Sequence, residues 1–403
     1  MTKIVSDVLP AQNLSDSSIK VVKGTENWRQ RLLWFTSPTL PLLALIGVLL
    51  HQTYGNDWWL VTPLAFVYIV VPLLDLIIGD KTSNHDATSL AIMEKDDYYK
   101  YLTFLIVPIH FIIMIVLAWY AATYANGWLG LINCGIVAGV YAGTAINTAH
   151  EMGHKTTRAE RFLSRVVLAV PFYGHFCIEH NNGHHRDVAT PEDVASSRMG
   201  ESIYRFALRE VPGALKRGLA SEQERLSKQG KRFFSLDNHI LQSYTMSLLL
   251  YGGLLAAFGW ILLPFLALNI VFSWLQLTSA NYIEHYGLLR KKNTKGRYES
   301  CKPYHSWNAN STFSNLALYQ LERHSDHHAH PTRRYQILRN CEDVPELPTG
   351  YFGMYLVAYI PWLWYHVMDK RVLAVPHING DMSKVNIDPR IKEKLLEKYT
   401  ATY

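Results

Sequence analysis

Long apolar runs alternate with charged stretches along the chain, and six of the runs are long enough to cross a membrane. They lie near residues 32–50, 57–79, 101–122, 128–149, 240–258 and 259–280. About 20 apolar residues in a helix span the hydrocarbon core of a bilayer. Pro38 and Pro41 interrupt the first run, and Phe258 and Gly259 mark a short gap between the last two, which are expected to form a tight hairpin. The pattern predicts an all-α membrane protein with six transmembrane helices.

The polar stretches between and after these runs predict a cap on one side of the membrane. A single membrane domain over residues 1–403 is expected, with transmembrane helices one to four in 32–149 and transmembrane helices five and six in 239–283. The cap is expected to combine residues 150–238 with residues 284–403, which include the C-terminal tail. Segments 161–180 and 351–368 are apolar but interrupted or rich in Trp and Tyr, so we expect them to lie along the membrane interface.

The charges of the loops predict the orientation of the chain. The connections near residues 51–57, 121–128 and 258–261 contain no Lys or Arg, whereas the loops after the second and fourth runs are basic. Lys and Arg accumulate on the cytoplasmic side of membrane proteins, so both termini and the cap are expected in the cytoplasm. The first thirty residues lack the pattern of a cleaved signal peptide, and the first run is expected to serve as the insertion signal.

Nine histidines form four clusters, each just past or between apolar runs. They are His150 and His154 in HEMGH, His180, His184 and His185 in EHNNGHH, His285 in NYIEHYG, and His324, His327 and His328 in HSDHH. Neutral imidazole is the commonest side-chain ligand for transition metals, and nine ligands exceed the capacity of one ion. The chain is therefore expected to have a cytoplasmic helical cap that holds a histidine-rich dinuclear metal site.

The spacing within the clusters suggests how they could serve two ions. Residues three or four apart on a helix share a face. In EHNNGHH, a helix would place His180 and His184 on one face, with His185 about 100° further round, so that this cluster could serve each ion. His324 is paired with both His327 and His328 in the same way. The sequence leaves open which histidine binds which ion.

Carboxylates stand beside the histidines in the sequence. Metal-bound imidazole normally donates its other N–H to a carboxylate or carbonyl, which fixes the orientation of the ring. The candidates for this role are Glu151, Asp187, Asp193, Glu284 and Asp326. The alternative for each is a solvated acid on the surface of the cap. His305 and His330 are near the clusters in sequence and are further candidates.

Other metal-binding classes fit the pattern less well. HEMGH matches the zinc-protease motif H-E-x-x-H, in which Glu151 would be the general base, but a catalytic zinc takes three protein ligands and leaves six histidines unexplained. The four cysteines form no C-x-x-C pair. A transporter would place polar groups near the bilayer midplane, yet the runs are almost free of charge apart from Asp75. A nitrogen-only site suits redox-active iron, although zinc or copper could bind the same ligands.

With these motifs in view, the chain resembles the integral-membrane di-iron alkane 1-monooxygenases, the bacterial alkane ω-hydroxylases of the membrane fatty-acid desaturase and hydroxylase superfamily. The similarity extends from the second run to about residue 370, and NYIEHYG is its most specific string. The resemblance implies that the nine histidines bind two iron ions. It also implies O2-dependent hydroxylation of the terminal methyl group of an n-alkane, with the second oxygen atom released as water.

The resemblance further implies an external source of electrons. Reduced rubredoxin, supplied by an NAD(P)H-dependent rubredoxin reductase, would dock on the basic cap, since the chain shows no flavin or dinucleotide fingerprint. The expected location is the bacterial inner membrane, with membrane lipid as a partner and no nucleic acid. The alternatives are an acyl desaturase or a xylene-type aryl-methyl hydroxylase of the same superfamily and, from a different class, a membrane metal transporter.

Alkanes dissolve in the bilayer, so we expect a tunnel among the spans that admits a chain methyl group first. With no polar group on the substrate, a narrow apolar pocket is the available source of orientation. Candidate lining residues, each with helix packing as the alternative, are Trp58, Trp59, Tyr68, Ile112, Ile132 and Tyr141.

Overall fold

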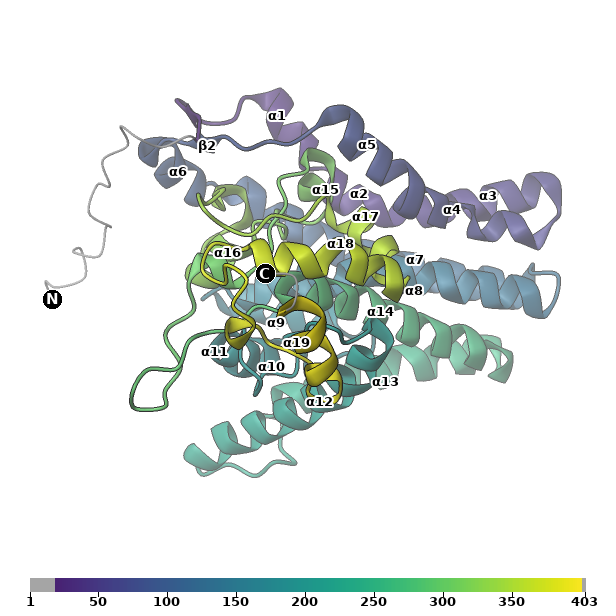
Figure 1. Cartoon of the computed structure of the whole chain (residues 1–403). Coiled ribbons are helices and arrows are strands. Elements are labelled where there is room, and N and C mark those ends of the chain that lie inside the picture. Colours follow the sequence, from purple (N-terminus) through teal and green to yellow (C-terminus); the bar gives the residue numbers. More distant parts are fainter. Residues whose placement is uncertain (1–18, 401–403) are drawn as a thin grey trace, which may run out of the picture.

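The computed structural model describes residues 19–400, and this stretch of the chain is mostly helical (Figure 1). Six helical segments are long and apolar enough to cross a membrane: Trp28–Tyr54, Asp57–Ile78, Asp97–Thr123, Trp128–Gly153, His239–Phe258 and Trp260–His285. The predicted all-α fold with six such segments is therefore confirmed. The prediction about a signal peptide falls largely on residues 1–18, which lie outside the described residues.

Local breaks follow the prolines and glycines of the spans. The spans contain α1 (Trp28–Leu33), α2 (Thr36–Thr39), α3 (Ala44–Tyr54), α4 (Thr62–Ala65), α5 (Val71–Ile78), α7 (Asp97–Thr123), α8 (Trp128–Gly153), α13 (His239–Phe258) and α14 (Leu263–His285). Around Pro41 the first span tightens into a 3₁₀ turn, Leu40–Leu43, because proline has no N–H to donate. Gly259, at φ +83°, makes the sharp turn between α13 and α14.

The remaining elements gather around one end of the spans (Figure 1). They are the parallel strands β1 (Val21–Val22) and β2 (Asn84–His85) and helices α6 (Ala87–Glu94), α9 (Arg158–Val167), α10 (Phe176–Glu179), α11 (His185–Asp187), α12 (Ile203–Lys228), α15 (Thr312–Ala317), α16 (His324–Ala329), α17 (Tyr351–Ala358), α18 (Pro361–Ala374) and α19 (Lys392–Thr400). Shorter 3₁₀ turns cover Asp57–Val61, Trp260–Leu262, Pro303–His305, Tyr335–Ile337, Met382–Lys384 and Pro389–Ile391, and π-helical segments cover Phe66–Val70 and His180–His184.

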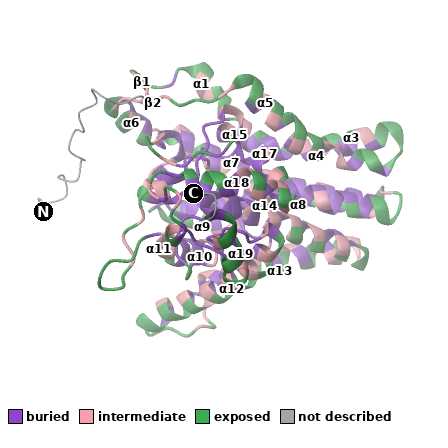
Figure 2. Ribbon diagram, in the orientation of Figure 1, coloured by how far each residue is buried: buried purple, intermediate pink, exposed green. Residues whose placement is uncertain are grey.

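Burial separates a central span from peripheral ones (Figure 2). In the most apolar window of α8, 78% of the residues are buried inside the protein, against 22% for the second span and 28% for α13. The peripheral spans expose large apolar side chains, including Leu76 and Leu249. Such faces are unfavourable in water and suit the hydrocarbon of a bilayer. The helix α8 therefore forms the core, and its neighbours contact lipid.

Three glycines allow α8 and α14 to pack closely. Gly135, Gly139 and Gly143 recur every four residues and face α14, so that a Cβ atom on Gly143 would lie 2.5 Å from the Cβ of Gln276. Small residues at this spacing let helix backbones approach each other in membrane proteins. Because these two helices end in His150 and His285, their contact also sets the relative position of two histidine clusters.

Asp75, the main charged residue within the predicted spans, has a structural partner. Its side chain is buried near the end of α5 and accepts a hydrogen bond from the backbone N–H of Ser314 at 3.0 Å and another from the Ser314 hydroxyl. A buried carboxylate needs such partners. Asp75 thus ties the second span to α15.

The glycine contact predicts the effect of a single methyl group. In Gly139→Ala, the new Cβ would lie 2.7 Å from the Cβ of Phe272 and 2.8 Å from the carbonyl oxygen of Asn269. We expect this overpacking to lower the free energy of unfolding by about 1–3 kcal/mol. The measurement is the thermal midpoint of the purified protein in detergent. Gly252→Ala on α13 is the matched control, since its Cβ would meet nothing within 4 Å. Equal midpoints for the two variants would contradict close packing of α8 on α14.

Candidate metal centre

The nine histidines come together at the end of the spans where the cap is attached. His150 lies in the last turn of α8, and His154 follows this helix. His285 is the last residue of α14. The cap contributes His180 and His184 from the segment between α10 and α11, His185 from the start of α11, and His324, His327 and His328 from α16. Helices and turns far apart in the sequence therefore meet at one place.

The nine imidazoles divide into two groups. One consists of His150, His154, His180, His185 and His327, and the other consists of His184, His285, His324 and His328. Within each group, one nitrogen atom from every ring lies within 4.8 Å of those of the others. Each group therefore has enough convergent donors to hold a metal ion.

The grouping of the histidines in EHNNGHH differs from the one predicted from the sequence. The α-helical spacing predicts that His180 and His184 share a face. The segment His180–His184 is π-helical instead, with more residues per turn than an α-helix. As a result His180 and His185 fall in one group, with their Nε2 atoms 3.1 Å apart, and His184 falls in the other. On α16, His324 and His328 belong to the four-histidine group, and His327 belongs to the five-histidine group.

The spacing of the nitrogen atoms fits two metal ions. Two ligands bound at right angles about 2.1 Å from an ion are about 3.0 Å apart. The observed Nε2–Nε2 distances are 3.0 Å for His150 and His327, 3.2 Å for His185 and His327, 3.2 Å for His285 and His324, and 2.9 Å for His324 and His328. The Nε2 atoms of His154 and His184 are buried without a hydrogen-bond partner among the described residues. Both groups therefore match the ligand shell of an ion.

Burial also keeps three of the cap histidines in the neutral form that binds metals. It lowers the pKa of His180, His327 and His328 well below the usual value, and the neighbouring imidazoles lower it further. A neutral imidazole presents a lone pair, whereas a protonated one does not. Burial therefore favours the neutral, metal-binding form of these three rings.

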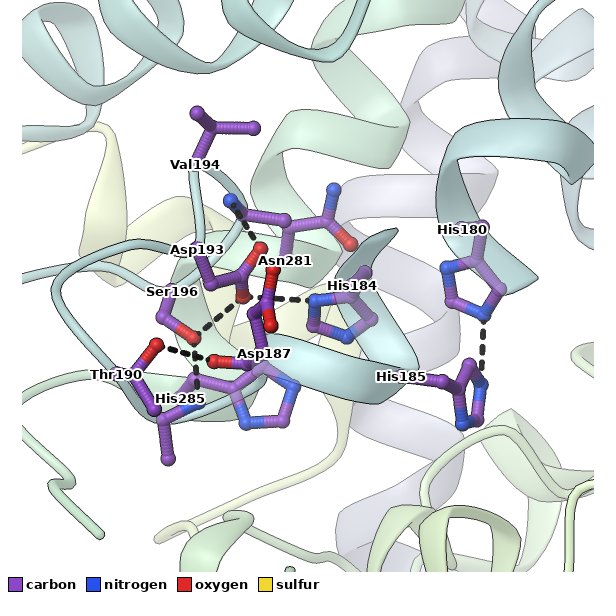
Figure 3. A network of polar contacts seen from close by, with 12 residues as sticks. His180, His184, His185, Asp187, Thr190, Asp193, Val194, Ser196, Asn281 and His285 are labelled. Atoms are coloured by element: carbon purple, nitrogen blue, oxygen red, sulfur yellow. Dashed lines mark hydrogen bonds and ion pairs between the residues drawn. The ribbon is translucent and has the colours of Figure 1, made fainter. Parts of the chain in front are cut away.

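Asp193 orients His184 within the four-histidine group (Figure 3). Its carboxylate accepts a hydrogen bond from Nδ1 of His184 at 2.9 Å, and others from the Ser196 hydroxyl and the Ala195 N–H. Burial alone would raise the pKa of Asp193, but His184 and these hydrogen bonds lower it below the usual value. The same carboxylate raises the pKa of His184 despite burial. With Nδ1 occupied, His184 presents Nε2 to its group.

A backbone carbonyl does the same for His285. Nδ1 of this ring donates to the carbonyl oxygen of His305 at 3.1 Å, so His285 also presents Nε2. His305 thus contacts the site through its backbone. Metal-binding histidines in proteins commonly have such a partner on the second nitrogen.

Three other candidate acids pair with cations in the described structure. Asp187 pairs with Arg217 at 2.8 Å, Glu151 with Lys155 at 3.0 Å, and Asp326 with Arg333. Each of these acids lies within three residues of a histidine of the site, and its partner comes from a neighbouring turn or segment. They hold the segments that carry the imidazoles in place.

Glu284 occupies a different position from the other acids. Its Oε2 lies 3.3 Å from Nε2 of His324, on the side where the ring nitrogens of the four-histidine group converge. Its Oε1 is buried and has no hydrogen-bond partner among the described residues. Glu284 therefore borders the space between the ligands rather than supporting an imidazole from behind.

A largely apolar cavity between α8 and α14 leads to both groups. Its lining includes Val140, Gly143, Thr144, Asn147 and His150 from α8, Gln276, Leu277, Ala280, Asn281 and Glu284 from α14, and Phe176, His180, Leu318, Leu321, His324, Phe352 and Tyr355 from the cap. None of the six tunnel residues named from the sequence lines this cavity. The signal that could have identified its wall is the helical spacing of three and four residues back from His150 and Glu284.

Sequence reasoning also missed Glu210, a buried acid on α12. It accepts hydrogen bonds from the Thr278 hydroxyl at 2.8 Å and from the Asn281 amide at 3.2 Å. Burial raises the pKa of Glu210 to about 7. Glu210 fixes the side chain of Asn281, which lines the cavity. Nothing in the spacing of α12 distinguishes this acid from a solvated one.

Comparisons with known proteins agree with this architecture. The fatty acid desaturase family model matches residues 126–362, which include all four histidine clusters. The chain is 49% identical over 371 residues to alkane 1-monooxygenase 1 of Alcanivorax borkumensis, covering 92% of this chain and 91% of the relative. It is 48% identical over 371 residues to the alkane 1-monooxygenase of Ectopseudomonas oleovorans, covering 92% of both chains.

A further relative is less similar to this chain. The hydroxylase component of the xylene/toluene monooxygenase of Pseudomonas putida is 28% identical over 231 residues, covering 56% of this chain and 59% of the relative. The two alkane 1-monooxygenases are more similar to this chain than the xylene/toluene monooxygenase component is, and their similarity covers nearly the full length of the chain. The chain therefore belongs to the alkane 1-monooxygenases, within the fatty acid desaturase family.

Proposed function

We propose that this protein hydroxylates the terminal methyl group of n-alkanes to give 1-alkanols, using O2 and two iron ions. The observation that carries the proposal is the arrangement of two histidine groups at the end of one apolar cavity. The relatives with nearly full coverage are named alkane 1-monooxygenases. An apolar cavity that ends at a redox metal centre suits a substrate that dissolves in lipid.

In this proposal each histidine group binds one iron ion. The five ligands of the first are His150, His154, His180, His185 and His327, and the four of the second are His184, His285, His324 and His328. Nitrogen donors without cysteine suit redox-active iron. When bound, the irons supply the activation of O2 and the oxidation of the C–H bond.

The protein's own residues position the substrate. An alkane has no polar group, so the apolar side chains of the cavity, such as Leu318, Leu321 and Phe352, orient it by shape and exclude water. In this proposal the alkane lies with one terminal methyl group toward His324 and Glu284. The carboxylate of Glu284, next to Tyr351, would hold a proton or bind a metal ion at this end of the cavity.

We further propose that the cap, the active site and both termini face the cytoplasm of a bacterial cell, with the spans in the inner membrane. The basic loops on the side of the histidines support this orientation. In this arrangement residues 150–238 and 284–403 form the cap on the spans of 32–149 and 239–283. The two electrons of each turnover come from reduced rubredoxin, an acidic protein suited to a basic cap, and ultimately from NAD(P)H through its reductase.

The alternatives have less support. The identity to the xylene/toluene monooxygenase component is lower and covers about half of the chain. For a transporter, polar groups would be expected near the midplane, whereas the polar cluster lies at the ends of α8 and α14 and Asp75 is tied to Ser314. For a zinc protease, Glu151 would face a catalytic water, whereas it pairs with Lys155.

A product assay tests the proposed reaction. Purified protein is supplied with rubredoxin, its reductase, NADH, octane and isotopically labelled O2, and the products are identified by mass spectrometry. We expect labelled 1-octanol from the wild type and none from His324→Ala, because His324 contacts both His285 and His328 within the site. Bound iron and rubredoxin oxidation without labelled alcohol from octane or any longer alkane would refute terminal alkane hydroxylation.

The hydrogen bond between Asp193 and His184 predicts a difference between two acids. Asp193→Asn removes the charge that orients His184, and we expect iron to bind about 10–100-fold more weakly. Asp237→Asn is the matched control, because Asp237 is an exposed acid that pairs with Lys231 at 2.7 Å. Iron retained against a competing chelator, measured by elemental analysis, gives both affinities. A loss as large in the control as in Asp193→Asn would show that Asp193 has no special role.

The shape of the cavity predicts a change of substrate preference. Val140 lies ten residues before His150 on α8, about 15 Å along the helix axis, and lines the far end of the cavity. In Val140→Phe we expect turnover of longer alkanes to fall at least about tenfold while that of shorter alkanes persists. Ile132→Phe, on the exposed side of α8, should leave the chain-length profile unchanged. An unaltered profile in Val140→Phe would exclude this cavity as the alkane site.

A further inference from the structure

A second cavity, separate from the metal centre, has an unusual concentration of arginines. Three of them, Arg158, Arg161 and Arg165, come from α9 at positions that share one helical face. The cavity has a volume of about 540 Å³ and lies between α9, α10, α12 and the first residue of α13. No acidic residue is found in its lining among the described residues. It is therefore a strongly cationic space.

The fourth arginine of the cavity is already neutralised. Arg225 forms a bidentate pair with Glu222, with both contacts at 2.7 Å. The amides in the wall are also engaged, since Asn181 donates to the carbonyl of Gly153 and Asn182 to the hydroxyl of Ser221. The arginines of α9 therefore remain as the cationic groups that an anion could engage.

Arg165 is the best indicator of a ligand. Its Nε is buried and has no hydrogen-bond partner among the described residues. Burial lowers the pKa of its guanidinium, and Arg161 and Arg225 lower it further, while Cys177 and Glu222 raise it. A buried cationic donor without a partner is costly, and an anion that accepts from it removes the cost. Arg205, Arg290, Arg323 and Arg339 also have a buried Nε without a partner, but their other guanidinium nitrogens pair with carboxylates or carbonyls.

The position of the cavity indicates which anion it receives. His239, in its wall, begins the fifth span, so the cavity lies at the level where a spanning helix meets the cap. Phe162, beside the arginines on α9, is 52% exposed, and Leu168 and Ile178 add apolar surface to the wall. Basic pockets next to apolar surface at the ends of spanning helices suit the headgroups of anionic lipids. We propose that this cavity binds the phosphate of an anionic phospholipid, with Arg161 and Arg165 as its principal ligands.

Lipid binding by the full-length protein in detergent tests the proposal. Native mass spectrometry follows titration with phosphatidylglycerol, phosphatidylcholine or inorganic phosphate. We expect one saturable phosphatidylglycerol site, bound at least about tenfold more weakly in Arg161→Gln/Arg165→Gln. The matched control, Lys216→Gln/Arg232→Gln, removes two exposed cationic side chains that do not line the cavity and should bind as the wild type does.

Each outcome decides a specific point. Equal binding of phosphatidylcholine and phosphatidylglycerol, or equal losses in the two double variants, would refute a specific site. Inorganic phosphate that binds as tightly as the lipid would assign the cavity to free phosphate and overturn the lipid. Arg165→Lys keeps the charge and, with an unchanged thermal midpoint, should weaken binding through the loss of the planar guanidinium alone. Wild-type affinity in both Arg165→Lys and Arg161→Gln would exclude these side chains as ligands.

Discussion

The close contact between α8 and α14 is the constraint on which the rest of the structure depends. Gly135, Gly139 and Gly143 bring the two helices together, and a Cβ at Gly143 would collide with Gln276. The same contact places His150 and His285 at one level and leaves a cavity along the shared face. Packing without a hydrophobic driving force needs this complementarity of shape. The relative position of His150 and His285 is therefore set by packing between the membrane-spanning helices.

The cap differs from the spans because it buries many polar groups. Unpaired polar atoms in a low-dielectric interior cost free energy, and ion pairs there need good geometry. Asp193, Asp187 and Asp326 meet this need by pairing with His184, Arg217 and Arg333. These pairs hold short helices such as α11 and α16, which are too short to be stable alone. Polar pairing in the cap thus complements shape in the spans.

The six spans and the nine histidines of the site could be predicted from the sequence, but the division of the histidines into two groups could not. Apolar runs indicate the six segments, and the four clusters indicate the nine imidazoles, because both signals are local. The partition of the ligands depends on the π-helical turn at His180–His184, which moves His185 to the group of His180. A π turn depends on tertiary context, and beside this one Glu179 pairs with Arg217 of α12 at 3.1 Å. The cavity wall was missed for a related reason, since the face that α8 presents to α14 is set by packing.

The arginine cavity and the metal centre share a wall, which joins the membrane surface to the active site. Gly153 and Asn181 line the cavity, and the amide of Asn181 donates to the carbonyl of Gly153 at 3.0 Å. Their neighbours along the chain are His154 and His180, both in the five-histidine group. An anion bound to α9 would therefore stabilise the same turn that presents these two imidazoles. A lipid headgroup bound as proposed would therefore act on the five-histidine group through the segment that carries His154 and His180.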